Sequence, residues 1–250
     1  EDPYNILCPE KNGLQCTAGC VATAMAMVMY YYRYPINGTG SFSYIPSPSI
    51  GTLSANFGDT YYAWEGMKDV IDGKYPIPIA ELQYHCGISV SMNYCSNGIA
   101  SGASSAAVPN RLQNFWRYTD AQYIEKEFYT LSSWINILKG EIDMARPLYY
   151  SGYSTSGGHA FVCDGYQGDD FHFNFEVPGR AKEIVTEELY DDGLIDHGRQ
   201  YIVVIGKKQM LINGEKQSRT VFKKYSRLID SMEEPWYFDE DDEFRILIGH

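Results

Sequence analysis

The fold of this chain is decided by one stretch, Gln15-Cys16-Thr17-Ala18-Gly19-Cys20, which runs directly into Val21-Ala22-Thr23-Ala24-Met25-Ala26-Met27-Val28-Met29-Tyr30-Tyr31-Tyr32. The apolar part carries no charge and is followed by Pro35, a residue at which a helix must stop. It therefore predicts a buried helix that is too short to span a membrane. Cys20 would lie in the first turn. There the unpaired backbone N–H groups and the helix dipole favour a thiolate, the nucleophilic form of cysteine. The small residue Gly19 would leave the sulfur approachable.

A structural interpretation of Cys20 competes with the catalytic one. Cysteine is among the most buried residue types, so a cysteine at the head of an apolar helix is more often structural. A nucleophile also needs a base and an orienting group, which lie near it in space and not in sequence. The choice therefore depends on what the rest of the chain supplies.

Composition indicates a globular protein and excludes some functions. The 250 residues are 44% apolar and 15% aromatic, which is enough material for a large core. The net charge of −12 and the absence of a basic stripe argue against nucleic acid and anionic membrane surfaces as partners. The chain begins at Glu1 without a signal-like segment, so we expect a form that has been processed or trimmed.

The cysteines predict neither a disulfide scaffold nor a metal site. There are six, at positions 8, 16, 20, 86, 95 and 163, too few to staple a chain of this size, and no Cys-x-x-Cys pair suggests zinc. No cofactor is expected. If Cys20 stays free, at least one other thiol is free as well. Cys86 with Cys95, or Cys8 with Cys16, could bridge a short loop, and the sequence leaves the pairing open.

Helices are predicted mainly in the first half of the chain. We expect an extended lead-in over 1–19 and an irregular stretch over 35–60, both punctuated by Gly, Pro and Asn. Apolar spacing predicts helices over 61–72, 77–86 (ended by Gly87), 108–116 and 121–129, and a further helix capped by Ser132 or Ser133 that ends before Pro147. Residues 88–94 alternate apolar and polar, which predicts a half-buried strand or an extended arm, and the small residues of 96–105 form either a flexible linker or a loop that borders a cleft.

Strands are predicted in the second half. Residues 148–150, 159–165 and 171–177 have strand character, and so does the β-branched run over 200–206. Asn213-Gly214 is a hairpin turn signal. The acidic and aromatic segment 233–243 is assigned no chemistry. Helices followed by strands indicate an α+β chain in two lobes.

His159 is the best candidate for the base. It follows Gly157-Gly158, which leaves the backbone open to an approaching peptide, and it begins the apolar strand that contains Ala160 to Cys163. An imidazole near Cys20 would take the thiol proton and later return it to the leaving amine. Of the other histidines, His172 alternates with phenylalanines and His197 lies in a charged loop.

Asn174 is the candidate that would orient this imidazole. The strands around residues 160 and 174 should form an antiparallel hairpin, whose register the sequence leaves open. A turn centred on Tyr166-Gln167 places Asn174 opposite His159, whereas a turn centred on Gly168-Asp169 places it opposite Cys163, about 13 Å further along at ~3.3 Å per residue. The amide oxygen of Asn174 would accept from the imidazole and fix its tautomer.

Gln15 is the candidate oxyanion donor. It lies five residues before Cys20, and its side-chain amide could join the Cys20 backbone N–H in binding the oxygen of the tetrahedral intermediate.

The set Gln15, Cys20, His159 and Asn174, in that chain order, resembles the streptopain family of bacterial papain-like cysteine peptidases. The resemblance covers roughly residues 3 to 206. It includes Pro3-Tyr4-Asn5, Gly19 to Ala24, Ala80-Glu81-Leu82, Gly87-Ile88-Ser89-Val90, the loop near 101–105, and Pro147 to Tyr150 followed by Gly157 to Val162.

The resemblance implies a papain-like fold, with a helical lobe over roughly 15–116 and an antiparallel β-sheet lobe over roughly 117–206. Residues 207–250 would be a C-terminal extension. It also implies a Cys20–His159 pair with Asn174 and Gln15 in support, substrate contacts at Gly157, Gly158 and Ser101, secretion or display at a bacterial cell surface, and an inhibitory pro-segment or protein inhibitor as a partner.

The chain departs from the family pattern after Asn174. The family continues with a Trp-Gly-Trp-Gly-Gly run, whereas this chain has Phe175-Glu176-Val177-Pro178-Gly179, so Phe175 replaces the tryptophan that shields the Asn–His contact. The spacings from Gln to Cys and from His to Asn are each one residue shorter.

The leading functional hypothesis is a secreted cysteine endopeptidase that acts on polypeptides through an acyl-enzyme. The alternative is a catalytically weak or inactive homologue that serves as a surface binding module. A third hypothesis is an acyl-transferring enzyme with the same Cys-His chemistry.

Overall fold

The computed structural model describes residues 2–67, 77–154, 157–168, 170–174, 179–196, 201–205, 209–230 and 245–248. The chain divides into two compact units, Glu1–Tyr150 with Ala160–Phe171 and Ser151–His159 with His172–His250. Each unit is described by itself. No helix of the described residues has the length and apolar character needed to cross a membrane.

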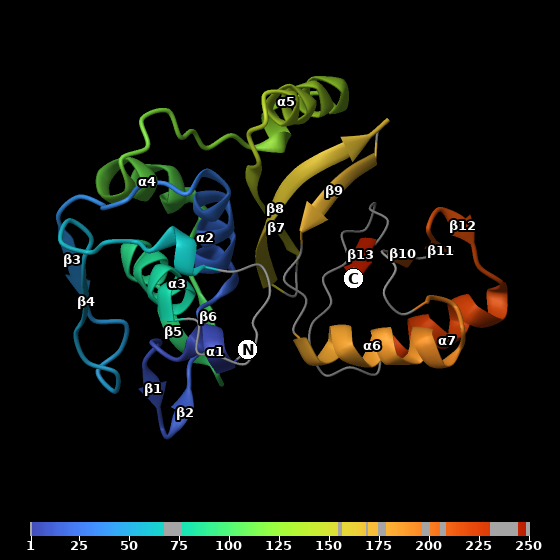
Figure 1. Cartoon of the computed structure of the whole chain (residues 1–250), viewed down its shortest axis with the longest axis horizontal. Helices are drawn as coiled ribbons and strands as arrows, with labels where there is room; N and C mark the ends of the chain where they lie inside the picture. The colour runs from blue at the N-terminus through green and yellow to red at the C-terminus, as the bar shows by residue number, and fades with distance from the viewer. Residues whose placement is uncertain are drawn as a thin grey trace. The chain divides into compact units, whose positions relative to one another are not determined.

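The buried helix of the first unit is confirmed. Helix α2 spans Cys20–Tyr32, and seven of its residues are buried. It ends at Arg33, whose left-handed backbone (φ 47°) lets its N–H bond the carbonyls of Met29 and Tyr30. Helix α3 (Ile77–Ser89) packs beside it (Figure 1). The apolar faces of these two helices form the centre of the core.

The prediction that Gly87 ends α3 was wrong. The helix continues to Ser89, and a Cβ on Gly87 would collide with the Tyr94 hydroxyl. Glycine stands there because of close packing and not because the helix ends. The strand predicted over 88–94 therefore begins later, as β5 (Asn93–Asn97), and pairs with β6 (Ala100–Gly102). The small-residue segment 96–105 is thus partly a hairpin.

The lead-in holds more structure than predicted. Helix α1 covers Asp2–Asn5, and β1 (Glu10–Lys11) pairs with β2 (Leu14–Gln15) around the Asn12-Gly13 turn. The stretch predicted as irregular over 35–60 contains a second hairpin, β3 (Ser41–Tyr44) with β4 (Leu53–Asn56). Its alternation of serine with aromatic residues is a strand signal that the surrounding Gly, Ser and Pro residues obscure.

Two predicted helices are absent where the structure describes them. Residues 61–67 form only a 3₁₀ turn (Trp64–Gly66), and residues 121–129 form another (Lys126–Phe128); residues 68–72 lie outside the described part. The Trp64 indole donates to the Pro35 carbonyl, a tertiary contact that outweighs helical periodicity. Phe128 is 75% exposed, so the second segment has no apolar face to bury.

The other two helices are confirmed. Helix α4 spans Val108–Trp116 and α5 spans Leu131–Asp143. The cap of α5 is Thr130, whose hydroxyl accepts from the Ser133 N–H, and not Ser132 or Ser133. A threonine in this position satisfies one of the unpaired donors of the first turn.

Three antiparallel strands follow, as predicted. They are β7 (Leu148–Ser154), β8 (Gly157–Gln167) and β9 (Asp170–Asn174), in the sheet order β7-β8-β9 (Figure 1). Only positions 168 and 169 separate β8 from β9, which agrees with the second of the two predicted turn placements.

The second unit contains a four-stranded sheet with two helices. The strand order is β12-β11-β10-β13, and the strands are β10 (Tyr201–Ile205), β11 (Met210–Ile212), β12 (Glu215–Lys216) and β13 (Arg245–Ile248). Helices α6 (Gly179–Asp191) and α7 (Arg219–Asp230) complete it, with Leu189, Val203 and Tyr225 in their shared core. Asn213-Gly214 forms the predicted turn. The described part of 207–250 therefore shares its sheet with β10, while segment 233–243 lies outside the described residues.

Candidate active site

Cys20 is the first residue of α2 and is half-buried. The other three free cysteines, Cys8, Cys86 and Cys163, are buried. Burial raises the pKa of Cys8 and of Cys163 to about 12, so those thiols stay protonated at neutral pH. Of the four free cysteines, Cys20 alone combines partial exposure with the N-terminus of a helix.

Gly19 must be a glycine for two reasons. Its φ of 86° lies in the left-handed region, which L-residues with a side chain adopt only at a cost. A Cβ at this position would lie 2.9 Å from the Ser101 carbonyl oxygen and 3.0 Å from the Met92 side chain. Ser101, predicted as a substrate-binding residue, therefore lies next to the residue that precedes Cys20.

The residues before Cys20, here called the nucleophile loop (15–19), are held from both sides. The Ala18 N–H donates to Asn5 Oδ1 over 2.8 Å. The Thr17 N–H and hydroxyl both donate to the Ile99 carbonyl, over 2.9 and 3.2 Å. These bonds join the nucleophile loop to α1 and to the turn between β5 and β6.

A disulfide between Cys16 and Cys95 links the nucleophile loop to β5. Neither pairing that the sequence left open is formed, because the β5–β6 hairpin lies against the nucleophile loop and brings together cysteines 79 positions apart. No local sequence signal could have identified this pair.

Gln15 lies in the nucleophile loop, but its side-chain amide has other partners. Its Nε2 donates to the Asn5 carbonyl (3.0 Å) and to the Cys8 carbonyl. These two bonds use both protons of the amide. Donation to an oxyanion would require the amide to give up one of them, and the oxyanion role of Gln15 stays a prediction.

His159 lies on β8 and is half-buried. Burial lowers the pKa of its imidazole, which favours the neutral form that can accept a proton. Gly157 and Gly158 precede it on the same strand. The imidazole therefore has the protonation state that a general base requires near neutral pH.

Asn174 is the last residue of β9 and is exposed. Its strand, β9, is the sheet neighbour of β8, the strand that carries His159. Its role as the orienting group stays a prediction, and Phe175, the proposed shield, lies outside the described residues. Cys20, Gln15 and Ser101 belong to the first compact unit, and His159, Asn174 and the two glycines belong to the second.

Tyr149 interacts electrostatically with Cys20, and sequence reasoning assigned it no role. Its hydroxyl lies 2.8 Å from the Ser105 hydroxyl. Burial is the main cause that raises the pKa of Tyr149, and the charge of Cys20 adds to it. The phenol therefore stays protonated beside Cys20. Its only sequence signal is its place in the Pro147 to Tyr150 segment of the resemblance.

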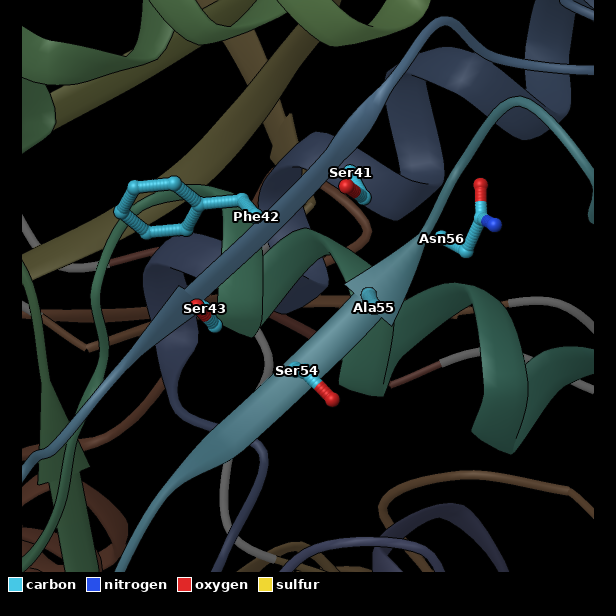
Figure 2. Close-up of a pocket in the computed structure, with 6 residues that line it drawn as sticks. All are labelled: Ser41, Phe42, Ser43, Ser54, Ala55 and Asn56. Carbon is cyan, nitrogen blue, oxygen red and sulfur yellow. The ribbon is translucent and has the colours of Figure 1, made fainter.

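Two other features lie outside this chemistry. A hollow over the β3–β4 hairpin is lined by Ser41, Phe42, Ser43, Ser54, Ala55 and Asn56 (Figure 2); it contains none of the predicted site residues, so we do not assign it to catalysis. Within the described ranges, no group of three or more His, Cys, Asp or Glu side chains could hold a metal ion.

A half-buried cysteine at the head of a core helix and a histidine on an antiparallel sheet are features of the papain-like cysteine peptidases. The chain belongs to the Peptidase C10 family, whose model matches residues 1–183. The predicted streptopain-like family and the α+β, papain-like fold class are confirmed.

Named relatives and a solved structure support this assignment. The chain is 35% identical over 204 residues to thiol protease/hemagglutinin PrtT of Porphyromonas gingivalis, covering 78% of this chain and 23% of PrtT. It is 32% identical over 193 residues to streptopain of Streptococcus pyogenes, covering 68% of this chain and 48% of streptopain. The chain thus spans about half the length of streptopain and about a quarter of PrtT. Active interpain A cysteine protease of Prevotella intermedia superposes with a TM-score of 0.65 at 36% identity, over 70% of this chain and 76% of interpain A.

Proposed function

We propose that this chain is a cysteine endopeptidase in which Cys20 is the nucleophile. The observation that carries the proposal is the contrast among the free cysteines. Cys20 is partly exposed at the N-terminus of α2, whereas the other three are buried. The Cys20 thiolate attacks the scissile carbonyl and forms a tetrahedral intermediate, which collapses to a thioester as the amine leaves.

His159 acts as base and then as acid. Its neutral imidazole takes the Cys20 proton and returns it to the leaving amine. It then takes a proton from the water that hydrolyses the thioester, which regenerates the thiol and releases the carboxylic acid. The orienting role of Asn174 requires its amide to reach the imidazole from β9, the sheet neighbour of β8, so that the nitrogen facing the sulfur carries the lone pair.

The oxyanion is bound by the Cys20 backbone N–H and the Gln15 amide. The first is a donor at the start of α2, where the helix leaves N–H groups for outside acceptors. The second requires the Gln15 amide to exchange its bond to Asn5 or Cys8 for one to the oxyanion as substrate binds.

Polypeptides are the substrates, and Ser101, Gly157 and Gly158 are proposed to contact their backbone. The closeness of Ser101 to Gly19 supports the first contact. The relatives named thiol protease support the substrate class. A pro-segment that blocks the site before maturation is proposed as a partner, with support from the solved prointerpain A fragment.

Secretion from a bacterial cell is proposed as well. A disulfide between two fully buried cysteines, Cys16 and Cys95, is typical of proteins that fold in an oxidising compartment.

The test is digestion of denatured casein by the folded protein under mild reducing conditions, with and without a thiol-alkylating epoxide. We expect cleavage that the epoxide abolishes in proportion to its addition to Cys20. A folded sample with a free Cys20 thiol and no cleavage would contradict the proposal and favour the binding module. A product that carries an added amine would favour the acyl-transferring enzyme.

A further inference from the structure

The helix end that carries the nucleophile cannot fix its own geometry. The N-cap of α2 is Gly19, which has no side chain to bond the N–H groups of the first turn and whose backbone, as in any glycine, is permissive. The direction of the nucleophile loop, and so the position of the Cys20 sulfur, must be set by whatever the loop contacts.

Those contacts form a closed ring that passes through the disulfide. Cys16 is bonded to Cys95, the Cys95 N–H donates to the Ser101 hydroxyl over 3.2 Å, and the Ser101 carbonyl faces Gly19. The chain from Cys16 to Gly19 closes the ring. Within the described residues, the disulfide is the one covalent cross-link between the nucleophile loop and the β5–β6 hairpin.

Cys95 is itself held firmly. Its carbonyl accepts from the Lys11 ammonium over 2.8 Å, its exposed fraction is 2%, and its backbone has a φ of 51° beside an irregularity in the β5–β6 pairing. The position of Cys95 is therefore fixed by its surroundings, and the disulfide attaches the nucleophile loop to it.

From this ring we infer that Cys16 and Cys95 are positioning residues for catalysis. Their disulfide holds the nucleophile loop against the β5–β6 hairpin, so that Cys20 and Ser101 keep the spacing that a bound peptide needs. The inference deepens the proposed function and rests on it. The active form has a reduced Cys20 and an oxidised Cys16–Cys95 pair.

We therefore expect peptidase activity to pass through a maximum as the concentration of reducing agent rises. A monothiol at low concentration frees Cys20 from small adducts, while the disulfide, with exposed fractions of 0% and 2%, resists attack. At high concentration a dithiol reduces it. One reagent thiolate attacks a cysteine sulfur, which breaks the S–S bond and forms a mixed disulfide. The second thiolate of the reagent then attacks the reagent sulfur of that mixed disulfide and releases the second cysteine. Two electrons and two protons pass to the protein as two thiols, and the reagent leaves as a cyclic disulfide.

The experiment compares the wild-type chain, the double variant Cys16→Ser/Cys95→Ser and the control Cys86→Ala, which removes a buried thiol from the same core. Each is checked for native near-ultraviolet circular dichroism. The pH dependence of Cys20 alkylation by iodoacetamide is then followed by mass spectrometry, together with kcat and KM for a peptide.

We expect the folded double variant to lose at least tenfold in kcat/KM, mostly in kcat, and to alkylate Cys20 at least fivefold more slowly at pH 7, while Cys86→Ala matches the wild type. A double variant that melts at a lower temperature but retains the wild-type alkylation profile and kcat while folded would overturn the inference, because the disulfide would then be merely structural. If no protein cleaves peptide, the peptidase proposal fails, and the alkylation profile still decides the positioning role.

If the double variant does not fold, a dithiothreitol titration of the wild-type chain decides. The fraction of the Cys16–Cys95 disulfide and the rate of Cys20 alkylation are measured at each concentration. A Cys20 reaction rate that falls as the disulfide disappears, in protein with native circular dichroism, supports the inference. A rate that stays unchanged through full reduction overturns it.

Discussion

Gly19 approaches Ser101 so closely that a Cβ would lie 2.9 Å from the Ser101 carbonyl oxygen. The contact joins the residue before the nucleophile to the predicted substrate-binding loop. Gly13 offers a matched comparison, because its φ of 76° is also positive but nothing lies within 4 Å of its Cβ position.

Replacement of Gly19 by alanine should therefore cost more than replacement of Gly13. Both variants carry the strain of a positive φ, roughly 1–2 kcal/mol of unfolding free energy, but only Gly19→Ala also displaces the Ser101 backbone. We expect Gly13→Ala to retain wild-type kcat/KM and Gly19→Ala to lose at least about tenfold, as measured with a peptide substrate and by urea unfolding. Equal effects of the two substitutions would argue that the contact has no role in catalysis.

Cys20 should be the only cysteine that alkylates in the native protein. Burial keeps the pKa of Cys8 and of Cys163 at about 12, and Cys86 is fully buried in α3. Iodoacetamide at pH 7 should add one equivalent per chain, located on Cys20 by peptide mapping, and guanidinium should expose the other three. Labelling of the four thiols at one common slow rate would indicate an unactivated Cys20.

The acid limb of kcat/KM should lie below pH 6.5. Burial lowers the pKa of His159, so the base stays neutral as the pH falls and activity is lost only when the pH passes through the lowered value. An acid limb at or above pH 7 would contradict this assignment.

The pH dependence of kcat/KM needs a control for unfolding, because a second histidine, His85, makes stability depend on pH in the same range. Burial lowers the pKa of His85 to about 4, and its Nδ1 lies 2.9 Å from the Tyr62 hydroxyl. The unfolded chain binds this proton more readily, so unfolding free energy should fall as the pH decreases from about 6.5 towards 4. Circular dichroism at each pH separates such unfolding from the titration of His159.

Asn174→Ala should lower kcat by roughly tenfold or more and change KM little, because a misdirected imidazole presents the wrong tautomer. His172, on the same strand, is a suitable control position, and His172→Ala should leave both constants near wild type. Stopped-flow hydrolysis of a peptide ester gives kcat for each variant. Equal kcat values for Asn174→Ala and the wild type would remove Asn174 from the site.

The sequence predicted those helices and strands that are determined by the local pattern of their own residues. Helices α2 and α4 follow from apolar spacing, and strands β7 to β9 follow from alternation and β-branched or aromatic residues. The segment 121–129 has helical spacing but packs no apolar face against a core. In the segment 61–67, Trp64 donates a hydrogen bond to the Pro35 carbonyl and no α-helix forms. The lack of a buried apolar face in the first segment and a tertiary contact in the second decided against the local pattern.

The candidate site divides in the same way. Cys20 could be identified because its setting is local, a helix start after a glycine. The Cys16–Cys95 pair and the bonds from Gln15 to the carbonyls of Asn5 and Cys8 depend on elements that are brought together only in the folded chain. The family resemblance supplied the order of residues, but it could not indicate where the Gln15 amide points.

The central claim, that Cys20 is the nucleophile and His159 its base, is tested most directly by one comparison of variants. Wild-type chain, Cys20→Ala and His159→Ala, each checked for native circular dichroism, are incubated with denatured casein, and the thiol-alkylating epoxide is added to parallel samples. We predict that only the wild type cleaves casein, and that the epoxide adds to Cys20 rapidly in the wild type and slowly in His159→Ala. Cleavage by folded Cys20→Ala, or equally fast epoxide addition without His159, would contradict the account.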